Sequence, residues 1–445
     1  MSFSERMREV REGFEPAFWV ANITELFERL AYYGVFAVLA IYLHETLKFT
    51  NSQAGDVIGF FSGLVWLLPT IGGTLADRFG FRRSLAFAYF VLALGYFLLG
   101  SLNAAWMAPV RSAIPISTLV LLVLAVPALG PAIVKPCVVG TTARASRENV
   151  RSLGYSIYYT LVNIGGTLGP IVAFTVRRSI GIENVFRVSA VCVLVMAFAT
   201  LIFFREPKSS GEAKVATVAQ AFRNFFTVLT NVRFMIFLVI FSGFWIMFWQ
   251  EFIALPLFLR GYVNARADAD LLTTVDPLAV ILLQIPISFL IRKVRAFPAM
   301  TLGILVTSFS WVILAIADLS WQLNGTWHIG PWALEITGLP VWAMLALFVL
   351  AIGEMIQSPR YYEYVSRLAP PGQQGVYMGF AFLPIAIGSF LAGRLGGRLV
   401  HYFGEVRHQP QQLWWVIAGI GFATTLLMWI YNRIVKPAEA PPASS

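Results

Sequence analysis

The sequence predicts an all-α polytopic membrane protein, with twelve transmembrane helices arranged as two six-helix bundles. Of the 445 residues, 58% are hydrophobic and only 13% are charged, about half the charged share of an ordinary soluble protein. Apolar runs such as 84–102 are long enough to cross a hydrocarbon core of roughly 30 Å. Lipid cannot hydrogen-bond the backbone, so these runs must form helices or a closed barrel. Their continuous apolar character favours helices.

Hydropathy places the spans, with boundary errors of several residues. They cover 18–43, 53–76, 84–103, 117–140, 152–176, 186–204, 234–259, 271–291, 298–317, 340–366, 373–397 and 413–432. Arginine and lysine gather in alternate loops, as they do in cytoplasmic loops. We therefore expect an integral protein of the bacterial inner (cell) membrane with both termini in the cytoplasm.

The chain divides at its longest polar break. We expect an N-terminal six-helix bundle at 1–204, a cytoplasmic linker at 205–233 and a C-terminal six-helix bundle at 234–436. The middle of the linker reads as a helix with one apolar stripe, which is typical of a segment lying on the membrane surface. The tail 437–445 is rich in proline, alanine and serine and is expected to be disordered.

Several classes of function are disfavoured by the composition. The net charge of +10 arises in short loops and is explained by membrane orientation, so no nucleic-acid partner is expected. Cys137 and Cys192 fall in spans and give neither a disulfide framework nor zinc-site spacing, and we expect no metal and no cofactor. An enzyme would need a catalytic cluster, and Asp268-Ala-Asp270 matches an aspartate-rich diphosphate-binding motif only poorly. We therefore expect no enzymatic activity.

Charged residues lie inside the first span. Glu25, Glu28 and Arg29 are spaced by three and four residues and share one helix face. Each ionised side chain in mid-span costs roughly 2.5–3.5 kcal/mol, so such residues usually face a polar interior and function there. Two carboxylates held close together cannot both stay ionised cheaply, which makes one a candidate proton carrier. The alternative is a static ion pair.

The fourth span combines three prolines with a lysine. Pro127, Pro131 and Pro136 bend the helix and free backbone carbonyls beside Lys135. A buried ammonium needs a carboxylate partner, and we expect Glu25 or Glu28 to supply it. The alternative is that Lys135 snorkels to the cytoplasmic end of its helix.

A glycine-punctuated turn with an acid beside a base follows the second span, from Gly73 to Arg83. Such a loop can clamp neighbouring helix ends and release them as two halves rock. It resembles the loop signature of the major facilitator superfamily; the alternative is an ordinary basic loop with a tight turn. The residues expected to form this gating loop are Gly73, Asp77, Arg78, Gly80, Arg82 and Arg83.

Five motifs in order resemble one branch of that superfamily, the proton-dependent oligopeptide transporters. The first span holds an ExxER motif followed by YYG, and the fourth span holds VKPC. The fifth span runs from Tyr155 to Gly166, the seventh contains Phe244-Trp245 and Phe248-Trp249-Gln250, and the tenth contains Gly353-Glu354 and Ser358-Pro359. Together they cover nearly the whole chain.

The resemblance implies a twelve-helix major facilitator fold and specific roles for residues that match. Glu25 and Glu28 would take part in proton coupling, with Lys135 as their switching partner. Arg29 and Lys135 would meet a peptide carboxylate, Glu354 would hold its amino terminus, and Asn163 would hydrogen-bond its backbone. The side-chain pockets would be lined by aromatic residues, namely Tyr32, Tyr33, Tyr159 and Trp245.

The chain also departs from the family pattern. Trp66 stands where a tyrosine is common, Trp249 where many members have an acid, and Asp276 where asparagine is usual. Glu251 lies close to the missing acid but on another face of a regular helix. The linker is too short for the two extra helices common in bacterial members.

We therefore expect a secondary active transporter that works by alternating access, with protons as the coupling ion. It would take up di- or tripeptides or similar small zwitterionic solutes and function as a monomer in the lipid bilayer. The alternative is a facilitator-type exporter or importer of a non-peptide metabolite or drug. An exporter of that kind would tolerate loss of Glu354.

Overall fold

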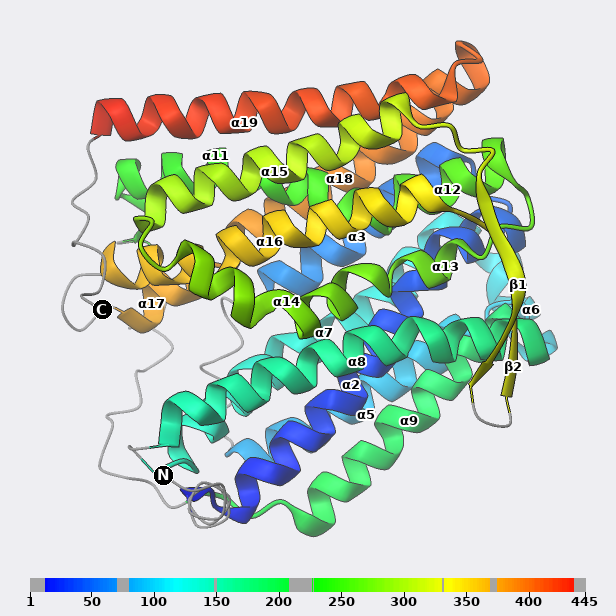
Figure 1. The fold of residues 1–445 in the computed structure, drawn as a ribbon. Coiled ribbons are helices and arrows are strands. Elements are labelled where there is room, and N and C mark those ends of the chain that lie inside the picture. The colour runs from blue at the N-terminus through cyan, green and yellow to red at the C-terminus, as the bar shows by residue number, and fades with distance from the viewer. Residues whose placement is uncertain are drawn as a thin grey trace.

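The computed structural model describes residues 13–69, 80–147, 150–207, 226, 228–329, 332–368 and 374–435 (Figure 1). Six long helices of the first half are α2 (Pro16–Ile41), α3 (Asn51–Leu67), α5 (Phe81–Leu99), α7 (Ile116–Arg144), α8 (Arg151–Ile180) and α9 (Ile182–Phe203). Six of the second half are α11 (Val232–Phe248), α14 (Val275–Ile291), α15 (Ala296–Ile316), α16 (Val341–Leu368), α18 (Leu383–Val400) and α19 (Leu413–Val435). The predicted twelve-helix architecture is confirmed.

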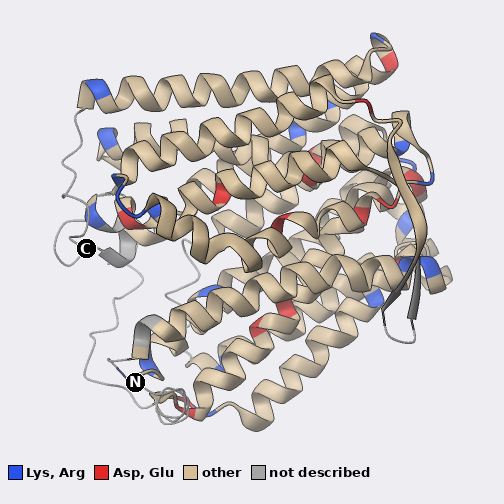
Figure 2. Cartoon of the chain, viewed as in Figure 1, with Lys and Arg blue, Asp and Glu red and all other residues tan. Residues whose placement is uncertain are grey.

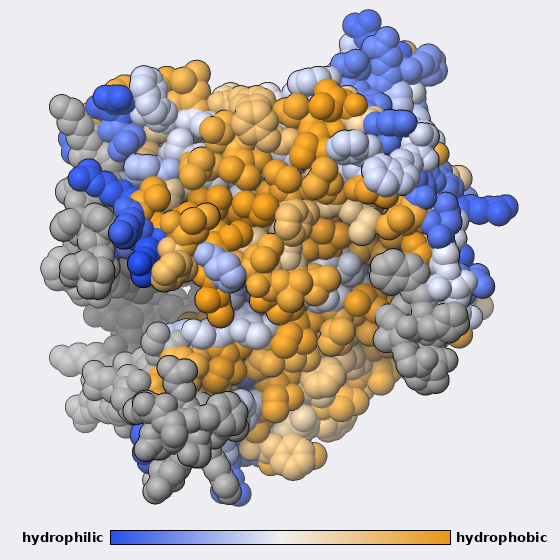
Figure 3. Space-filling view, in the orientation of Figure 1, coloured by the Kyte–Doolittle hydropathy of each residue, from blue (hydrophilic) through white to orange (hydrophobic). Residues whose placement is uncertain are grey.

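Eleven helices of the described part are long and apolar enough to cross a membrane. The remaining predicted span, 53–76, corresponds to α3, and residues 70–79 lie outside the described part of the chain. A belt of hydrophobic side chains runs across the middle of the molecule, with hydrophilic residues gathered toward both helix ends (Figure 3). The protein is therefore integral to a membrane.

Short elements connect the long helices. They are η1 (Tyr42–Thr46), η2 (Ala105–Met107), α6 (Ala108–Ala113), η4 (Trp249–Glu251), α12 (Ala254–Phe258), η5 (Leu259–Val263), α13 (Ala269–Leu272), α17 (Gln374–Phe380), η6 (His401–Val406) and η7 (Pro410–Gln412). Strands β1 (Gln322–Ile329) and β2 (Trp332–Pro340) form an antiparallel hairpin between α15 and α16. These strands occupy the segment between the predicted spans 298–317 and 340–366. The predicted surface helix of the linker lies largely outside the described residues.

Local sequence explains where several helices begin and bend. Thr50 caps α3 in a capping box: its hydroxyl accepts from the Gln53 backbone at 3.2 Å, and the Gln53 side chain accepts from the Thr50 N–H at 2.9 Å. Pro16 occupies the first turn of α2, where a missing N–H costs nothing. The three prolines predicted in the fourth span lie inside α7, which remains one continuous helix.

The two bundles meet closely at one end of the molecule, here named the hairpin end, where β1 and β2 lie (Figure 1). Glycines bring α3 and α18 together there. A Cβ added to Gly393 would lie 2.3 Å from the Gly59 Cα, and one added to Gly397 would lie 2.3 Å from the Asn51 carbonyl oxygen. Only small residues allow backbones of membrane helices to approach so closely.

Ion pairs between the bundles also gather at the hairpin end (Figure 2). Arg177 Nε lies 2.8 Å from Asp270 Oδ2, and Arg178 Nη2 lies 2.9 Å from Asp268 Oδ2. Two further pairs are Arg398 with Asp56 at 2.9 Å and Arg260 with Glu45 at 2.6 Å. Asp268 also accepts from the Thr337 N–H of β2 at 2.8 Å. The hairpin end is therefore closed.

The opposite end, where α2 begins and α19 ends, is here named the termini end. The helices of the two bundles diverge toward it (Figure 1), and the molecular surface is hollowed between them on this side (Figure 3). Every ion pair between two described residues of different bundles lies at the hairpin end. The structure is thus one state of a two-bundle protein, open at its termini end.

Candidate functional site

The charged group predicted in the first span lies within α2 and is fully buried. Arg29 is 2% exposed, Glu25 1% and Glu28 0%. Arg29 donates two hydrogen bonds to Glu28, from Nε to Oε2 at 2.5 Å and from Nη2 to Oε1 at 2.7 Å. Its Nε lies 3.5 Å from Glu25 Oε1. Arg29 is thus held bidentately by its sequence neighbour, and neither oxygen of Glu25 has a hydrogen-bond partner among the described residues.

Close packing of α8 against α2 places the fifth-span residues beside this group. A Cβ on Gly165 would lie 2.6 Å from the Leu26 carbonyl oxygen and 2.8 Å from the Arg29 Cβ. Only glycine allows this approach. Asn163 precedes Gly165 by two residues in α8, and its Nδ2 donates to the Tyr159 carbonyl oxygen at 2.9 Å. Tyr159 remains 40% exposed on the half of α8 nearer the termini end.

The structure gives Lys135 an aromatic partner in place of the expected carboxylate. Its Nζ lies 3.9 Å from the centroid of the Trp66 ring and 5.7 Å from that of Phe382. Within the described residues, Lys135 forms no ion pair within 4.0 Å, although it interacts electrostatically with Glu25, Glu28 and Arg29. A direct ion pair with Glu25 or Glu28 is therefore absent among the described residues in this state, and the ring of Trp66 contacts the ammonium.

The second bundle contributes three acids, here named the acidic cluster: Glu251 of η4, Asp276 of α14 and Glu354 of α16. Helix α11 ends at Phe248, and the tighter η4 turn that follows changes the direction in which Glu251 points. Glu251 is 1% exposed, and both of its carboxyl oxygens lack a hydrogen-bond partner among the described residues. Glu251 therefore does not take the orientation expected from a regular helix, because the helix is interrupted at Trp249.

Tyr33 of α2 lies against the second bundle. Its ring lies 6.4 Å from that of Phe252, the residue after Glu251. A Cβ added to Gly166 of α8 would lie 3.5 Å from Tyr33 Cδ2 and 3.4 Å from the Cβ of Pro277, the residue after Asp276. Neighbours of Glu251 and Asp276 thus lie close to α2 and α8, where the two bundles meet.

The other predicted aromatic residues differ in their placement. Tyr32 is 1% exposed and lies inside the first bundle, with its ring 5.0 Å from Phe36 and the Arg29 guanidinium 4.8 Å from its centroid. Trp245 is buried between Phe244 and Phe248. Tyr33 and Tyr159 are the two that lie between the bundles.

The gating loop is described only in part. Gly73, Asp77 and Arg78 lie outside the described residues. Gly80 has φ of +81°, and the Arg82 N–H donates to Glu206 Oε1 at 2.8 Å, while Arg82 and Arg83 are exposed at the termini end. This contact ties the start of α5 to the segment that follows α9.

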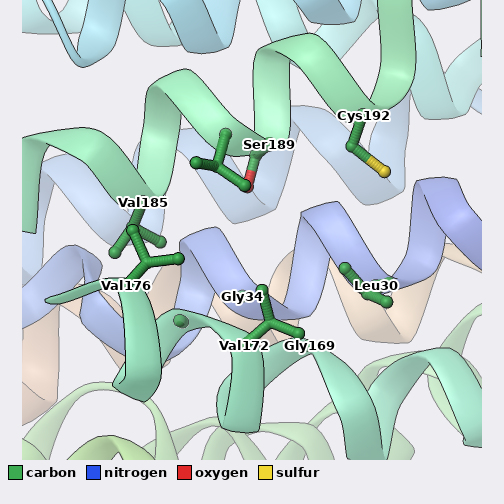
Figure 4. Close-up of a pocket in the computed structure, with 10 residues that line it drawn as sticks. Leu30, Gly34, Gly169, Val172, Val176, Val185, Ser189 and Cys192 are labelled. Carbon is green, nitrogen blue, oxygen red and sulfur yellow. The ribbon is translucent and has the colours of Figure 1, made fainter. Parts of the chain in front are cut away.

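A small crevice lies apart from these charged groups, between α2, α8 and α9 (Figure 4). It is lined by apolar and small residues that include Leu30, Gly34, Gly169 and Cys192, and its volume of about 10 Å³ has room for one water molecule at most. The described residues contain no group of three His, Cys, Asp or Glu side chains that could hold a metal ion. The crevice is too small and too apolar to serve as the ligand site.

Sequence reasoning missed the contacts that join distant helices. Trp66 was noted only as a departure, although an aromatic residue in the second span and a lysine in the fourth are consistent with a cation–π pair. Arg177 and Arg178 directly follow the predicted fifth span at 152–176, and Asp268 and Asp270 were compared only with an enzyme motif, although these residues pair across the bundles. Their opposite charges were the one available signal that they pair.

Comparisons with known proteins agree with this architecture. The sequence profile of the Major Facilitator Superfamily matches residues 22–265 and 252–445. The chain is 24% identical over 418 residues to the multidrug resistance protein MdtH of Aeromonas salmonicida (strain A449), covering 92% of this chain and 94% of that protein. It is 28% identical over 190 residues to dipeptide and tripeptide permease B of Edwardsiella piscicida, covering 42% of this chain and 36% of the permease.

A solved structure of a POT family transporter in complex with 5-aminolevulinic acid has the same fold. It superposes with a TM-score of 0.73 at 16% identity, covering 94% of this chain and 96% of that one. The resemblance predicted from the sequence motifs is confirmed, with the match extending over nearly all of both chains. The chain belongs to the major facilitator superfamily and has the fold of its proton-dependent oligopeptide transporters.

Proposed function

We propose that the chain is a secondary active transporter that couples proton entry to uptake of di- or tripeptides or similar small zwitterionic solutes. One observation carries the proposal: Arg29 and Lys135 belong to the first bundle, which would form one wall of the binding site, and the acidic cluster belongs to the second bundle, which would form the other. A zwitterion has a carboxylate for the first wall and an ammonium for the second. Two bundles that rock can close on such a ligand from either side.

In this proposal the first bundle binds the ligand carboxylate and carries a proton. Arg29 and Lys135 would supply positive charge, and Glu25, which has no hydrogen bond, would take up and release the proton. Glu28 would keep Arg29 in place through its two short hydrogen bonds. Protonation of Glu25 would remove a charge that competes with the ligand for Lys135.

The second bundle would bind the amino end of the ligand through Glu354, with Tyr159 and Asn163 of α8 contacting the ligand backbone and side chains. Two comparisons support this ligand class. One relative is named a dipeptide and tripeptide permease, and a protein of the same fold was solved with 5-aminolevulinic acid, which carries both an amino group and a carboxylate.

The energetics are adequate for uptake against a gradient. One proton that moves down 100 mV supplies about 2.3 kcal/mol, which supports about a fiftyfold gradient of a neutral ligand. With the termini end in the cytoplasm, the closed hairpin end would face outward and the present state would release ligand inward. The chain would act as a monomer in the bacterial inner membrane with no cofactor.

A second candidate function is export of a drug or other non-peptide metabolite. It is favoured by the relative named a multidrug resistance protein, which matches 92% of this chain, whereas the permease matches 42%. An exporter of hydrophobic compounds has no need of the buried acidic cluster. The two candidates therefore differ in what loss of Glu354 does.

The test is uptake of labelled dialanine into proteoliposomes under an inward proton gradient. Wild type should accumulate dialanine above the external concentration, and Glu354→Gln and Lys135→Ala should lose accumulation. The matched control is Glu335→Gln, on β2 and outside the site, which should leave uptake unchanged. Absence of dialanine uptake together with proton-driven movement of a lipophilic cation would favour the export candidate.

A further inference from the structure

Four aromatic side chains pack together where the two bundles meet, and they are here named the aromatic seam. They are Phe36 of α2, Phe61 of α3, Trp249 of η4 and Phe252, which directly follows η4. The ring centroid of Phe36 lies 5.2 Å from that of Trp249 and 5.8 Å from that of Phe252. Phe36 also lies 5.5 Å from Phe61, and Trp249 lies 5.5 Å from Phe252. None of the four is more than 3% exposed, so the seam joins the bundles through close apolar contact.

The helical repeat of α2 places the seam beyond the charged group. Phe36 follows Arg29 by seven residues, which is about two helical turns, so both lie on one face of α2. Helix α2 begins at the termini end (Figure 1), so Phe36 lies about 10 Å nearer the hairpin end than Arg29 does. Tyr33 lies between them on this face, and its ring is 6.4 Å from that of Phe252. The seam therefore separates the charged group of α2, which consists of Glu25, Glu28 and Arg29, from the hairpin end.

Tight packing continues this layer on both sides of the seam. Gly59 precedes Phe61 by two residues, and a Cβ added to it would lie 3.1 Å from the Gly393 Cα of α18. On the other side, a Cβ added to Gly166 of α8 would lie 3.4 Å from the Pro277 Cβ of α14. The bundles are thus in contact from α3 on α18, through α2 on η4, to α8 on α14.

The ion pairs at the hairpin end do not exclude water by themselves. Arg398 is 48% exposed, its partner Asp56 41% and Arg178 40%. The seam contains a single side-chain polar atom, Trp249 Nε1, which has no hydrogen-bond partner among the described residues. A buried water needs several polar partners, and a hydrophobic constriction expels water. The seam is therefore the apolar layer between the solvated hairpin end and the charged group of α2.

We propose that the aromatic seam is a seal that keeps water and protons from passing between the hairpin end and the charged group of α2. The termini end is open in this state, so a break in the seam would join the two sides of the membrane through water. When the hairpin end opens in turn, Phe36 must separate from Trp249 and Phe252, and the termini end must already be closed. The seal goes beyond the proposed function, because it holds whichever ligand the protein carries.

The seal is tested by proton leakage without any ligand. Proteoliposomes that contain the full chain and a trapped pH-sensitive dye receive valinomycin, and an outward potassium gradient then makes the interior negative. Wild type should acidify no faster than protein-free liposomes. Phe36→Ala and Phe252→Ala each remove a ring of the seam and should raise the acidification rate by about tenfold, the change expected when a barrier falls by about 1.4 kcal/mol.

Trp249 allows the effect of the ring to be separated from that of its N–H. Trp249→Phe keeps a ring in the seam and should stay as tight as wild type, whereas Trp249→Ala should leak. Phe87→Ala is the matched control, because it makes the same change as Phe36→Ala at a position of α5 that is 58% exposed. It should acidify at the wild-type rate. Monodisperse elution and unchanged circular dichroism establish that each variant is folded.

Acidification by folded Phe36→Ala and Phe252→Ala at the rate of Phe87→Ala would overturn the proposal. Dialanine uptake, measured on the same proteoliposomes, separates the seal from the proposed function. If wild type does not take up dialanine but the seam variants leak, the proposed function fails and the seal stands. If wild type takes up dialanine and the seam variants do not leak, the seal fails alone.

Discussion

The ammonium of Lys135 rests on the indole of Trp66, with Nζ 3.9 Å from the ring centroid. Helix α7 provides the lysine and α3 provides the tryptophan, and Phe382 at the start of α18 lies 5.7 Å from the same ammonium. A desolvated cation–π contact stabilises the pair by roughly 0.5–2 kcal/mol. Lys135 thus contacts aromatic rings from both bundles, Trp66 of α3 and Phe382 beside α18.

Replacing Trp66 should weaken ligand binding. In Trp66→Leu the ammonium loses its aromatic partner and turns toward Glu25, so it meets the ligand carboxylate less readily. A loss of 0.5–2 kcal/mol corresponds to a rise in the KM for dialanine of about two- to thirtyfold. Trp66→Tyr, which keeps an aromatic face, should stay near the wild-type KM. Equal KM values for Trp66→Leu and wild type would show that the contact between Trp66 and Lys135 does not contribute to ligand binding.

The two carboxylates of the first span should behave differently when neutralised. Glu28 holds Arg29 through two hydrogen bonds, whereas Glu25 lies 3.5 Å from Arg29 and has none. Glu28→Gln leaves a buried guanidinium without its partner, which costs roughly 3–5 kcal/mol. It should therefore lower the melting temperature and the yield of folded protein.

Glu25→Gln should instead keep the fold and lose proton-driven accumulation of the ligand. We expect exchange of internal for external dialanine to persist at a rate within a few fold of wild type, because that reaction needs no net proton movement. Accumulation under a proton gradient should fall to the equilibrium level. Proton-driven accumulation by folded Glu25→Gln protein would exclude Glu25 as the proton carrier.

The sequence predicted the helices well, and it predicted contacts within a helix better than contacts between helices. Glu25, Glu28 and Arg29 could be placed on one face because a helix fixes their spacing. Lys135 was located correctly in the fourth span, but its partner was assigned by charge alone, and an aromatic ring took that place. Spacing along one helix says nothing about which face of another helix lies opposite.

The closed hairpin end shows the same limit on a larger scale. Gly59 and Gly393 are more than three hundred residues apart, and nothing in either local pattern indicates that their backbones touch. The β1–β2 hairpin was missed because hydropathy indicates membrane spans, and strands β1 and β2 lie between two of them. Glu251 was discounted because the η4 turn, which redirects it, cannot be seen in a hydrophobic pattern.

The ion pairs of Asp268 should set the balance between closed and open hairpin ends. Asp268 is fully buried and interacts with Arg177, Arg178 and the Thr337 N–H. Asp268→Asn removes charged hydrogen bonds that contribute roughly 1.5–3 kcal/mol each, so the hairpin end should open more often. The ratio of open to closed states should rise by tenfold or more.

Electron–electron distance measurements can follow that opening. Spin labels at Ser112 of α6 and Ser320, both exposed at the hairpin end on different bundles, report their separation when Cys137 and Cys192 are replaced. Asp268→Asn should add a longer distance to the distribution. Asp318→Asn, a nearby exposed change, should leave the distribution as in wild type. An unchanged distribution in Asp268→Asn would show that the glycine contact alone closes this end.

The contact between Gly59 and Gly393 should be the most sensitive point of that closure. A Cβ on Gly393 would lie 2.3 Å from the Gly59 Cα and 2.4 Å from the Gly55 carbonyl oxygen, and relieving such overlap costs roughly 1–3 kcal/mol. Gly393→Ala should therefore disfavour the state open at the termini end and slow uptake by about tenfold. Gly419→Ala is a matched control in α19, because no atom lies within 4 Å of its added Cβ. Uptake by Gly393→Ala at the rate of Gly419→Ala would mean that transport does not pass through this packing of α3 on α18.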